Sequence, residues 1–485
     1  MNRFQIVLLC VVAALLAESS SARAGARDVK VTTDQTIDNS SLEAIVRDVF
    51  ARSGAKTNDE KAIALYEYLH QAIFLYAYPT ESKPQSVGPL KMINVYGWGL
   101  CGGQHTVLKA LFETAGWKCR YVGWDGHTTI EVYYDDRWHY FDVFLKCYYW
   151  SKDKSHVVSQ DEIAADASIV RDAVKEGRAA RQNLCCGDTI DGVISGIKTR
   201  KVVGDSKGWA SVTWRDQNYR TALDLPAGAA LKLEWKAEKD GFATTGKPPV
   251  HTCGNKDFRL DAVLGPLFEH YGPRGFATGS FIYQPDFSKP ADVADLELKN
   301  VSASDGKLVA NGNGSVIFKL PLPYAWVSGQ VDAVFAGGKG QLALSTDGGK
   351  TWSDVPGGKL DGLVKQHYDV WLKADFTGKL EKLRVDAAVE HNRGSLPYLV
   401  VGKNKITVST EKNELPRGAS LVVTYTYQEA TAPAKRQRYD GNGVKYGEVK
   451  TVTKEITSLP YSFEIEVGGN TPPKMLALER KIAGK

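Results

Sequence analysis

Three residues of the sequence could together carry out nucleophilic acyl chemistry: Cys101, His127 and Asp142. Cys101 lies in the glycine-punctuated run Asn94–Gly103, directly before apolar residues at helical spacing, so it should sit at the start of a helix. The free N–H groups at a helix N-terminus lower the pKa of a thiol. An imidazole oriented by a carboxylate would complete the site.

The histidine and the aspartate are expected on one β-hairpin. His127–Tyr134 and Arg137–Val143 are rich in β-branched and aromatic residues, and Asp135-Asp136 separates them like a two-residue turn. Counting outward from that turn places His127 and Asp142 diagonally on one face, where long side chains can meet. Asp142 would then fix the tautomer of His127 and favour its imidazolium form.

The sequence around these residues resembles the core of the transglutaminase-like superfamily, which has a papain-like fold. The runs that carry the resemblance are Tyr96–Gln104, Gly116–Gly123 and His127 with Trp138–Asp142. The resemblance implies a catalytic triad of Cys101, His127 and Asp142 within roughly residues 58–145. The sequence departs from many members at Thr128-Thr129, where a small and an aromatic residue usually follow the histidine.

In such a site the thiolate adds to an amide or ester carbonyl, backbone N–H groups at the helix start stabilise the oxyanion, and the histidine protonates the leaving group. Water or an amine then resolves the thioester. The candidate substrate-binding residues are Trp98, Gln104, Trp124 and Trp138. The three tryptophans could shield the acyl intermediate, although aromatic residues in such numbers are more often part of a core, and that interpretation is favoured.

Other interpretations of these residues stay open. Cys101 could instead be a buried thiol or half of a disulfide, although its flanking glycines favour close approach of a ligand to the backbone. His105, one turn after Cys101, raises the alternative of a zinc site, but with Cys119 and His127 as further ligands the spacing fits no familiar zinc pattern. His139 is the rival base. It falls on the opposite hairpin face if the turn has two residues, and a three-residue turn would exchange the faces.

Composition bounds the class of protein. The chain has 485 residues, beyond the length at which one core keeps growing, so several domains are expected. Hydrophobic residues at 43% and charged residues at 24% exclude a disordered or fibrous chain. The net charge of +5 is too small to indicate a nucleic-acid partner. No cofactor and no metal is predicted.

Residues 1–24 have the features of a cleavable signal peptide. Asn2 and Arg3 precede an apolar run, Phe4–Leu16, and Ala22 and Ala24 are small residues at the positions that signal peptidase recognises. We expect cleavage after Ala24 and a secreted or periplasmic protein. The remaining sequence has no apolar stretch long enough for a transmembrane helix, so no integral membrane segment is expected in the mature chain.

Cysteine usage is consistent with an oxidising compartment. Cys10 would leave with the signal, and Cys101 is the candidate nucleophile. The five others can form at most two disulfides, whose pairing the sequence does not determine. They are Cys119, Cys147, Cys185, Cys186 and Cys253.

The fold class predicted for the chain is a papain-like or transglutaminase-like α+β domain followed by all-β domains of the β-sandwich type. Local patterns in the first part predict helices over Ser41–Ala51 (with Asn39 or Ser40 as N-cap), from Asn58, over Gln104–Thr114 and over Ser159–Ala180, and a strand over Lys118–Trp124. The expected domains are 25–200 (α+β), 201–300 (β-rich), 301–410 (β-sandwich) and 411–485 (C-terminal β-rich).

One further motif, Ser345–Trp352, matches the Asp-box pattern S-x-D-x-G-x-T-W. Its physical content is a hairpin turn in which the aspartate accepts local N–H groups and the tryptophan packs. A single copy is interpreted as a structural element and not as a sign of glycosidase activity.

The function predicted from the sequence is that of an exported cysteine enzyme. It would act on peptide, protein or cell-wall amides through a thioester, with hydrolysis favoured over amine transfer because water is always available as acceptor. The alternative is a catalytically silent surface protein that mediates adhesion or binds glycans through its β modules.

Overall fold

The computed structural model describes residues 25–75, 79, 81, 87–124, 126–176, 189–203, 219–236, 276–432 and 445–484. The expected signal peptide lies outside these residues, as do Cys185, Cys186 and Cys253. Cys101 and Cys147 are both buried and form no disulfide.

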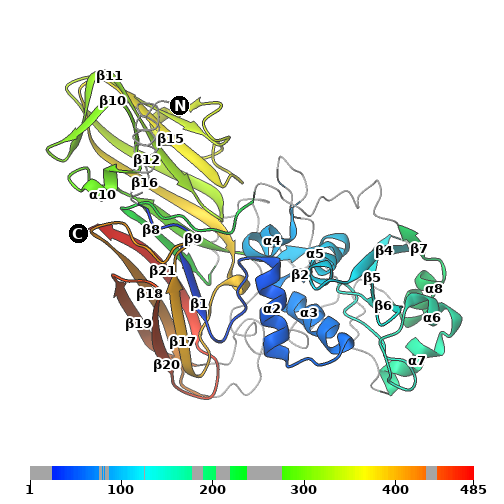
Figure 1. Ribbon diagram of the computed structural model, residues 1–485. Helices are drawn as coiled ribbons and strands as arrows, with labels where there is room; N and C mark the ends of the chain where they lie inside the picture. Colours follow the sequence, from blue (N-terminus) through cyan, green and yellow to red (C-terminus); the bar gives the residue numbers. More distant parts are fainter. Residues whose placement is uncertain are drawn as a thin grey trace, which may run out of the picture.

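The first part of the described chain mixes helices with a small antiparallel sheet, on the right of Figure 1. Side-chain capping interactions start the first two long helices of this part. The Ser41 hydroxyl accepts the Ala44 N–H (3.0 Å), so Ser41 is the N-cap of the first helix and the expected Asn39 or Ser40 is wrong. Thr57 and Glu60 form a capping box at the start of the second.

The elements of this part alternate between helix and strand. They are α2 (Leu42–Ser53), α3 (Asn58–Ala72), β2 (Phe74–Leu75), α4 (Pro89–Lys91), the π-helix η1 (Met92–Tyr96), β3 (Trp98–Gly99), α5 (Cys101–Thr114), β4 (Lys118–Trp124), β5 (His127–Tyr134), β6 (Arg137–Phe141), α6 (Gln160–Ala165), α7 (Ser168–Lys175), α8 (Ile190–Lys198) and β7 (Lys201–Val203). The helices expected at 41, 58 and 104 and the strand at 118 are confirmed. A single helix was expected over 159–180, but the described residues of this stretch form two helices, because the chain leaves helical conformation at Asp166. Residues 177–180 lie outside the described residues.

The predicted hairpin is confirmed. Asp135 and Asp136 both adopt left-handed φ angles, 48° and 59°, as the two central residues of a type I′ turn require. Tyr134 is paired with Arg137, and the register continues regularly to Ile130 opposite Phe141. A two-residue turn therefore sets which side chains share a face.

This sheet, in the order β6-β5-β4-β7, is covered on both faces (Figure 1). One face packs against α2, α3 and α5 through a core that includes Leu108, Phe112 and Phe141. The other face packs against α6, α7 and α8, where Tyr140 and Ile194 are buried together. The central side chains of both faces, among them Ile130, Tyr140 and Phe141, are thus buried.

The rest of the described chain is almost entirely β. Its elements are β1 (Lys30–Thr33), β8 (Ala229–Glu234), β9 (Phe276–Tyr283), α10 (Pro290–Val293), β10 (Glu297–Ser304), β11 (Lys307–Pro321), β12 (Ala325–Ala336), β13 (Gly340–Ser345), β14 (Ser353–Asp354), η4 (Pro356–Gly358), β15 (Asp369–Phe376), β16 (Lys379–Asn392), η5 (Arg393–Ser395), β17 (Gly402–Ser409), β18 (Ala419–Ala430), β19 (Tyr446–Ile456), β20 (Tyr461–Val467) and β21 (Lys474–Gly484). The expectation that the second half is all-β is confirmed.

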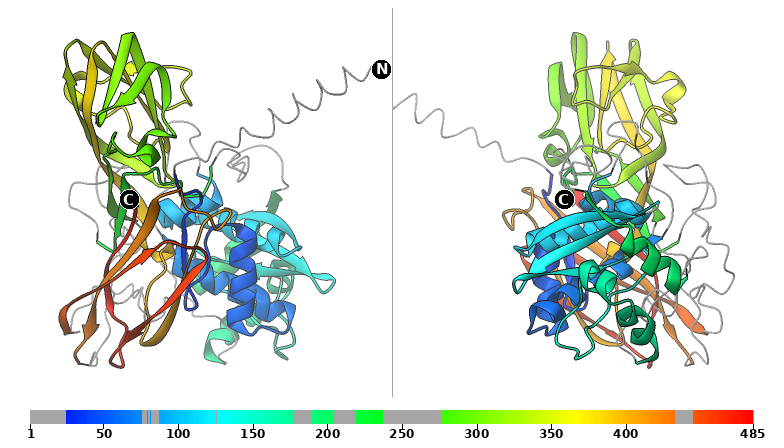
Figure 2. Two further views of the ribbon diagram at one scale, coloured as in Figure 1. Left: turned by 60° about the vertical axis from the view of Figure 1, so that its left-hand side comes forward. Right: turned by 90° about the vertical axis from the view of Figure 1, so that its right-hand side faces the viewer.

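These strands form two antiparallel sheets over a shared apolar core. Among the described residues, a sheet of 12 strands runs from β14 to β19, and β1, β17 and β20 form a second sheet. The strands β10–β15 project beyond the other elements in both views of Figure 2. Strand pairing in the larger sheet continues across residues 300 and 410, where domain boundaries were expected. There β9 pairs with β16, and β8 pairs with β21.

The Asp-box is the turn between β13 and β14. Asp347 accepts hydrogen bonds from the N–H groups of Lys350 (3.0 Å) and Thr351 (2.9 Å), and the Trp352 indole donates to the Gly349 carbonyl (3.1 Å). These contacts are all local, as the structural interpretation of the motif requires.

Buried hydrogen bonds join the helical part to the end of β16. The Asn392 amide is fully buried and donates to the carbonyls of Ala72 (2.9 Å) and Ile93 (2.6 Å). The Glu81 carboxylate accepts the hydroxyls of Tyr96 (2.7 Å) and Tyr368 (2.6 Å). Because Asn392 and Glu81 are buried, their polar groups need these partners, and the pairing helps fix how the two parts meet.

None of the described helices has both the length and the apolar character needed to cross a membrane.

Replacing Asn392 with alanine should destabilise the protein. The change leaves two buried carbonyls without these donors, so the free energy of unfolding should fall by about 2–4 kcal/mol. Urea unfolding followed by tryptophan fluorescence measures it. Asn311→Ala, at an exposed position of β11, is the matched control and should change stability by less than about 0.5 kcal/mol. An Asn392→Ala protein as stable as the control would contradict the role of this residue.

Candidate active site

Cys101 is the first residue of α5, and its side chain is almost covered, with 7% of the residue exposed. The first hydrogen bond of this end of the helix runs from the Gln104 N–H to the Leu100 carbonyl (2.9 Å), and no side chain caps the helix start. The thiol interacts with His127 and with the backbone N–H groups of Gly102 and Thr128. All three contacts favour a thiolate.

His127 is the first residue of β5. Its Nε2 lies 2.7 Å from Asp142 Oδ2, which leaves Nδ1 as the ring nitrogen available to the Cys101 thiol. The rings of Trp124 and Phe144 lie against the imidazole, with centroids at 4.9 and 5.1 Å. Only 10% of the His127 side chain is exposed, so the pair lies in a nearly dry environment.

Asp142 follows directly after β6 and has no exposed surface. Its Oδ2 also accepts the Tyr140 hydroxyl (2.9 Å), and its Oδ1 accepts the Leu145 N–H (2.7 Å). A buried carboxylate needs such partners, because an ionised group without them is strongly disfavoured. The hydrogen bonds hold Asp142 charged and aimed at His127.

The protonation states follow from these contacts. Burial alone would lower the pKa of His127, but the charge and hydrogen bond of Asp142, with those of Cys101, raise that pKa to about 10. Burial alone would raise the pKa of Cys101, but its hydrogen bond to His127 and the imidazolium charge lower that pKa overall. For Asp142, too, burial is outweighed, chiefly by the His127 charge, and the pKa falls well below its usual range. The arrangement therefore favours a thiolate–imidazolium pair at neutral pH.

The four residues expected to bind substrate are placed differently. Trp124 lies on His127, as described above. Trp98 is 1% exposed and packs edge-on against Tyr96 (5.4 Å), and Gln104 is buried on α5. Trp138 pairs with Tyr133, at the end of the hairpin opposite to His127, and its ring stacks on the Arg120 guanidinium (4.2 Å). The structure thus brings only Trp124 into contact with the imidazole.

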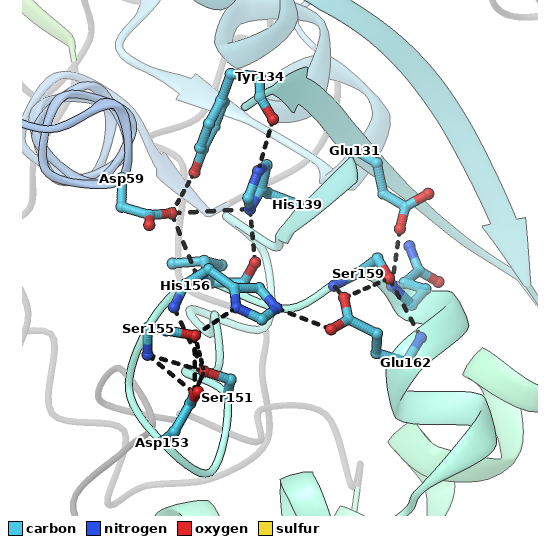
Figure 3. A network of polar contacts seen from close by, with 12 residues as sticks. Asp59, Glu131, Tyr134, His139, Ser151, Asp153, Ser155, His156, Ser159 and Glu162 are labelled. Carbon is cyan, nitrogen blue, oxygen red and sulfur yellow. Dashed lines mark hydrogen bonds and ion pairs between the residues drawn. The ribbon is translucent and has the colours of Figure 1, made fainter. Parts of the chain in front are cut away.

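The rival base, His139, belongs to a different polar network (Figure 3). Its Nδ1 donates to the Val157 carbonyl (2.6 Å), its Nε2 faces the Tyr134 carbonyl (3.1 Å), and its ring stacks on the Tyr134 ring at 3.6 Å. It lies on the opposite face of the hairpin from His127, as the two-residue turn predicts. Both of its nitrogens face backbone carbonyls and neither is available to Cys101.

The zinc alternative receives no support from the geometry. Cys119 lies in β4 opposite Val132, in the body of the sheet, whereas Cys101 is at the start of α5. Within the part of the chain that the structure describes, no three His, Cys, Asp or Glu side chains converge as metal ligands.

Several contacts of this site were not predicted from the sequence. Tyr140, two residues before Asp142, shares its face of the strand, so period-2 alternation could have identified it. Gly196 of α8 packs against Trp124, and no local sequence pattern could have identified this contact. A Cβ there would lie 1.7 Å from Trp124 Cε3, so the glycine lets α8 press the indole onto His127.

Helix, cysteine and hairpin together define a class of protein: an α+β domain in which a thiol at a helix start meets a histidine and an aspartate on antiparallel strands. Residues 44–143 match the sequence model of the transglutaminase-like superfamily. The chain therefore contains a transglutaminase-like superfamily domain, followed by an antiparallel β-rich region. The match includes Cys101, His127 and Asp142 and ends before α6. No curated protein matches the chain significantly. Cysteine-dependent acyl transfer or hydrolysis is the chemistry that this superfamily suggests.

Gly196→Ala should expose Cys101. The added methyl group must displace the Trp124 indole or α8, so we expect a loss of about 1–3 kcal/mol of stability and faster alkylation of Cys101 by iodoacetamide. Peptide mass spectrometry measures the alkylation. Gly192→Ala, in the same helix but near only the Thr189 hydroxyl (3.3 Å), is the control and should leave the rate unchanged. Equal rates in the two variants would show that Trp124 does not limit access.

Asp142→Asn should lower the pKa of His127 from about 10 to below about 7, because burial would no longer be opposed by the carboxylate. NMR titration of the labelled imidazole measures the shift. Asp161→Asn, a surface carboxylate with 62% side-chain exposure, should leave the pKa unchanged. Because the pKa of His127 is higher in the folded protein than in the unfolded chain, protonation of His127 stabilises the folded state. That stabilisation is complete below about pH 6.5 and is lost as the pH rises toward 10. If the pKa of His127 stays near 10 in Asp142→Asn, Cys101 and not Asp142 would be the cause of the raised value.

Proposed function

We propose that the protein is a cysteine-dependent acyl-transfer enzyme that uses Cys101 as nucleophile, His127 as general acid and base, and Asp142 as the group that orients the histidine. The observation that carries this proposal is the continuous line of contacts from the thiol through His127 to the buried carboxylate, with pKa shifts that favour the charged pair. A structural cysteine would need neither the imidazole nor the carboxylate.

The first half of the reaction forms a thioester. The Cys101 thiolate adds to the carbonyl carbon of an amide, and the carbonyl π-electrons move to oxygen. Uncapped N–H groups at the start of α5 are positioned to stabilise that oxyanion. His127 then gives its Nδ1 proton to the leaving amine as the C–N bond breaks, which leaves an acyl–Cys101 thioester and a neutral imidazole.

The second half returns the enzyme to its starting state. Neutral His127 accepts a proton from water, the hydroxide oxygen adds to the thioester carbonyl, and Cys101 leaves as a thiolate beside the regenerated imidazolium. An amine in place of water gives a new amide by the same proton movements. We favour hydrolysis, because water is always available as acceptor.

The substrate class proposed is a peptide, protein or cell-wall amide, encountered outside the cytoplasm. The N-terminal sequence features of residues 1–24 support export, and an acyl group on a polypeptide or peptidoglycan stem is the amide that such a compartment offers. In this proposal the β-rich region, joined to the helical part through Asn392 and Tyr368, positions the substrate or binds partners.

Alkylation of Cys101 by iodoacetamide across pH tests the proposal. The wild-type rate constant should stay high well below pH 8.5, the pKa of a free thiol, because His127 keeps the thiol ionised. In His127→Ala the reactivity near pH 6 should fall by about 10-fold or more.

Cys147 is the internal control. It is buried beside Asp142 and Tyr140, and burial, followed by the Asp142 charge, raises its pKa, so it should stay unmodified in the folded protein. A Cys101 that reacts only after unfolding would overturn the enzyme proposal and favour the silent, glycan-binding alternative.

A further inference from the structure

We propose that His105 is a positioning residue that fixes the distance between the nucleophile and the His127–Asp142 pair by bridging the start of α5 to the backbone beyond Asp142. The proposal rests on the proposed function, because it gives His105 a role in the same site. His105 has no exposed surface and lies one turn after Cys101 on α5.

Each ring nitrogen of His105 contacts a different side of the site. Nδ1 lies 2.7 Å from the carbonyl oxygen of Cys101, and Nε2 lies 3.2 Å from the Val143 backbone nitrogen. Val143 directly follows Asp142. The imidazole therefore spans from the residue that would attack to the residue next to the one that orients the base.

These two partners determine the tautomer. A carbonyl oxygen can only accept, so Nδ1 of His105 must carry the hydrogen, and the Val143 N–H can only donate, so Nε2 must present its lone pair. Nε2 also lies 3.5 Å from Asp142 Oδ1, farther than from the Val143 nitrogen, so the Val143 N–H is its nearer partner. Asp142 Oδ1 accepts the Leu145 N–H (2.7 Å).

The bridge matters because the reacting groups come from three separate elements: α5, β5 and the segment after β6. The segment after Asp142 is held on its other side by paired backbone hydrogen bonds between Asp142 and Cys147 (2.9 and 3.0 Å). His105 adds a direct bridge from this segment to the Cys101 backbone, and its ring also lies edge-on to the His127 ring (5.8 Å). A displacement of about 1 Å between reacting groups can cost about 100-fold in rate.

The same geometry argues against a direct chemical role for His105. Both of its nitrogens are engaged by backbone groups, and the ring has no exposed surface, so it cannot exchange a proton with substrate or water. A metal-ligand role would need the Nε2 lone pair, which the Val143 N–H occupies. Its contacts therefore fit a positioning role.

Two substitutions separate the hydrogen-bond bridge from other properties of the side chain. His105→Phe keeps a ring and removes both hydrogen bonds. His105→Gln removes the ring and the titratable group but supplies one N–H donor and one oxygen acceptor, as the neutral imidazole does. Thr114→Val is the matched control, because the Thr114 hydroxyl makes a similar bond to a helix carbonyl (Ala110, 2.8 Å) at the other end of α5.

The measurement is the rate constant of Cys101 alkylation by iodoacetamide from pH 5 to 9, with folding checked by circular dichroism. In His105→Phe we expect the rate at pH 6 to fall by about 10-fold or more, with the pH profile displaced toward that of a free thiol. In His105→Gln the wild-type profile should return to within about 3-fold, and Thr114→Val should match the wild type. His105→Leu replaces the phenylalanine variant if the latter does not fold.

The outcomes separate this proposal from the proposed function. A reactive wild-type Cys101 whose profile is unchanged in folded His105→Phe or His105→Leu would overturn the positioning role alone. Equal loss in folded His105→Gln and His105→Phe would also overturn it, because the imidazole itself would then be required. A wild-type Cys101 with the reactivity of an ordinary thiol would overturn both proposals.

Discussion

The carboxylate of Asp142 is cut off from solvent, and its charge has to be compensated where it lies. His127, the Tyr140 hydroxyl and the Leu145 N–H provide that compensation, and they come from β5, β6 and the segment after β6. The site can therefore form only when these three segments are correctly assembled. The same requirement holds the imidazole in the orientation that leaves its other nitrogen for Cys101. The arrangement of the three segments and the orientation of His127 thus meet at one buried carboxylate.

The surroundings of this charge pair decide how strong and how accessible it is. Trp124 and Phe144 cover the imidazole, and α8 presses on Trp124 through Gly196, so little water reaches the site. Electrostatic attraction between thiolate and imidazolium is stronger in such surroundings than in water. The helices α6–α8 lie beyond residues 44–143, which match the transglutaminase-like superfamily, whereas Trp124 lies within them.

Hydrogen bonds connect the β-rich region to the helical part of the chain. Asn392 at the end of β16 donates to the carbonyls of Ala72 and Ile93, which lie on the segments leading to β3 and the cysteine helix. Tyr368 and Tyr96 share the Glu81 carboxylate. These contacts connect the β-rich region to the segments that precede α5, the helix that carries Cys101. The Asp-box is a local turn between β13 and β14, at one end of the 12-stranded sheet.

The sequence by itself determined what depends on neighbouring residues. Period-2 alternation and a two-residue turn predicted the β5–β6 hairpin and the shared face of His127 and Asp142, and glycines before apolar residues at helical spacing predicted Cys101 at the start of a helix. Only the tertiary structure decided contacts between distant elements: Gly196 on Trp124, His105 against Val143, Trp138 on Arg120 and the pairing of β9 with β16. Turns and alternation are set by local backbone sterics, whereas these contacts depend on how whole elements pack, which no short stretch of sequence encodes.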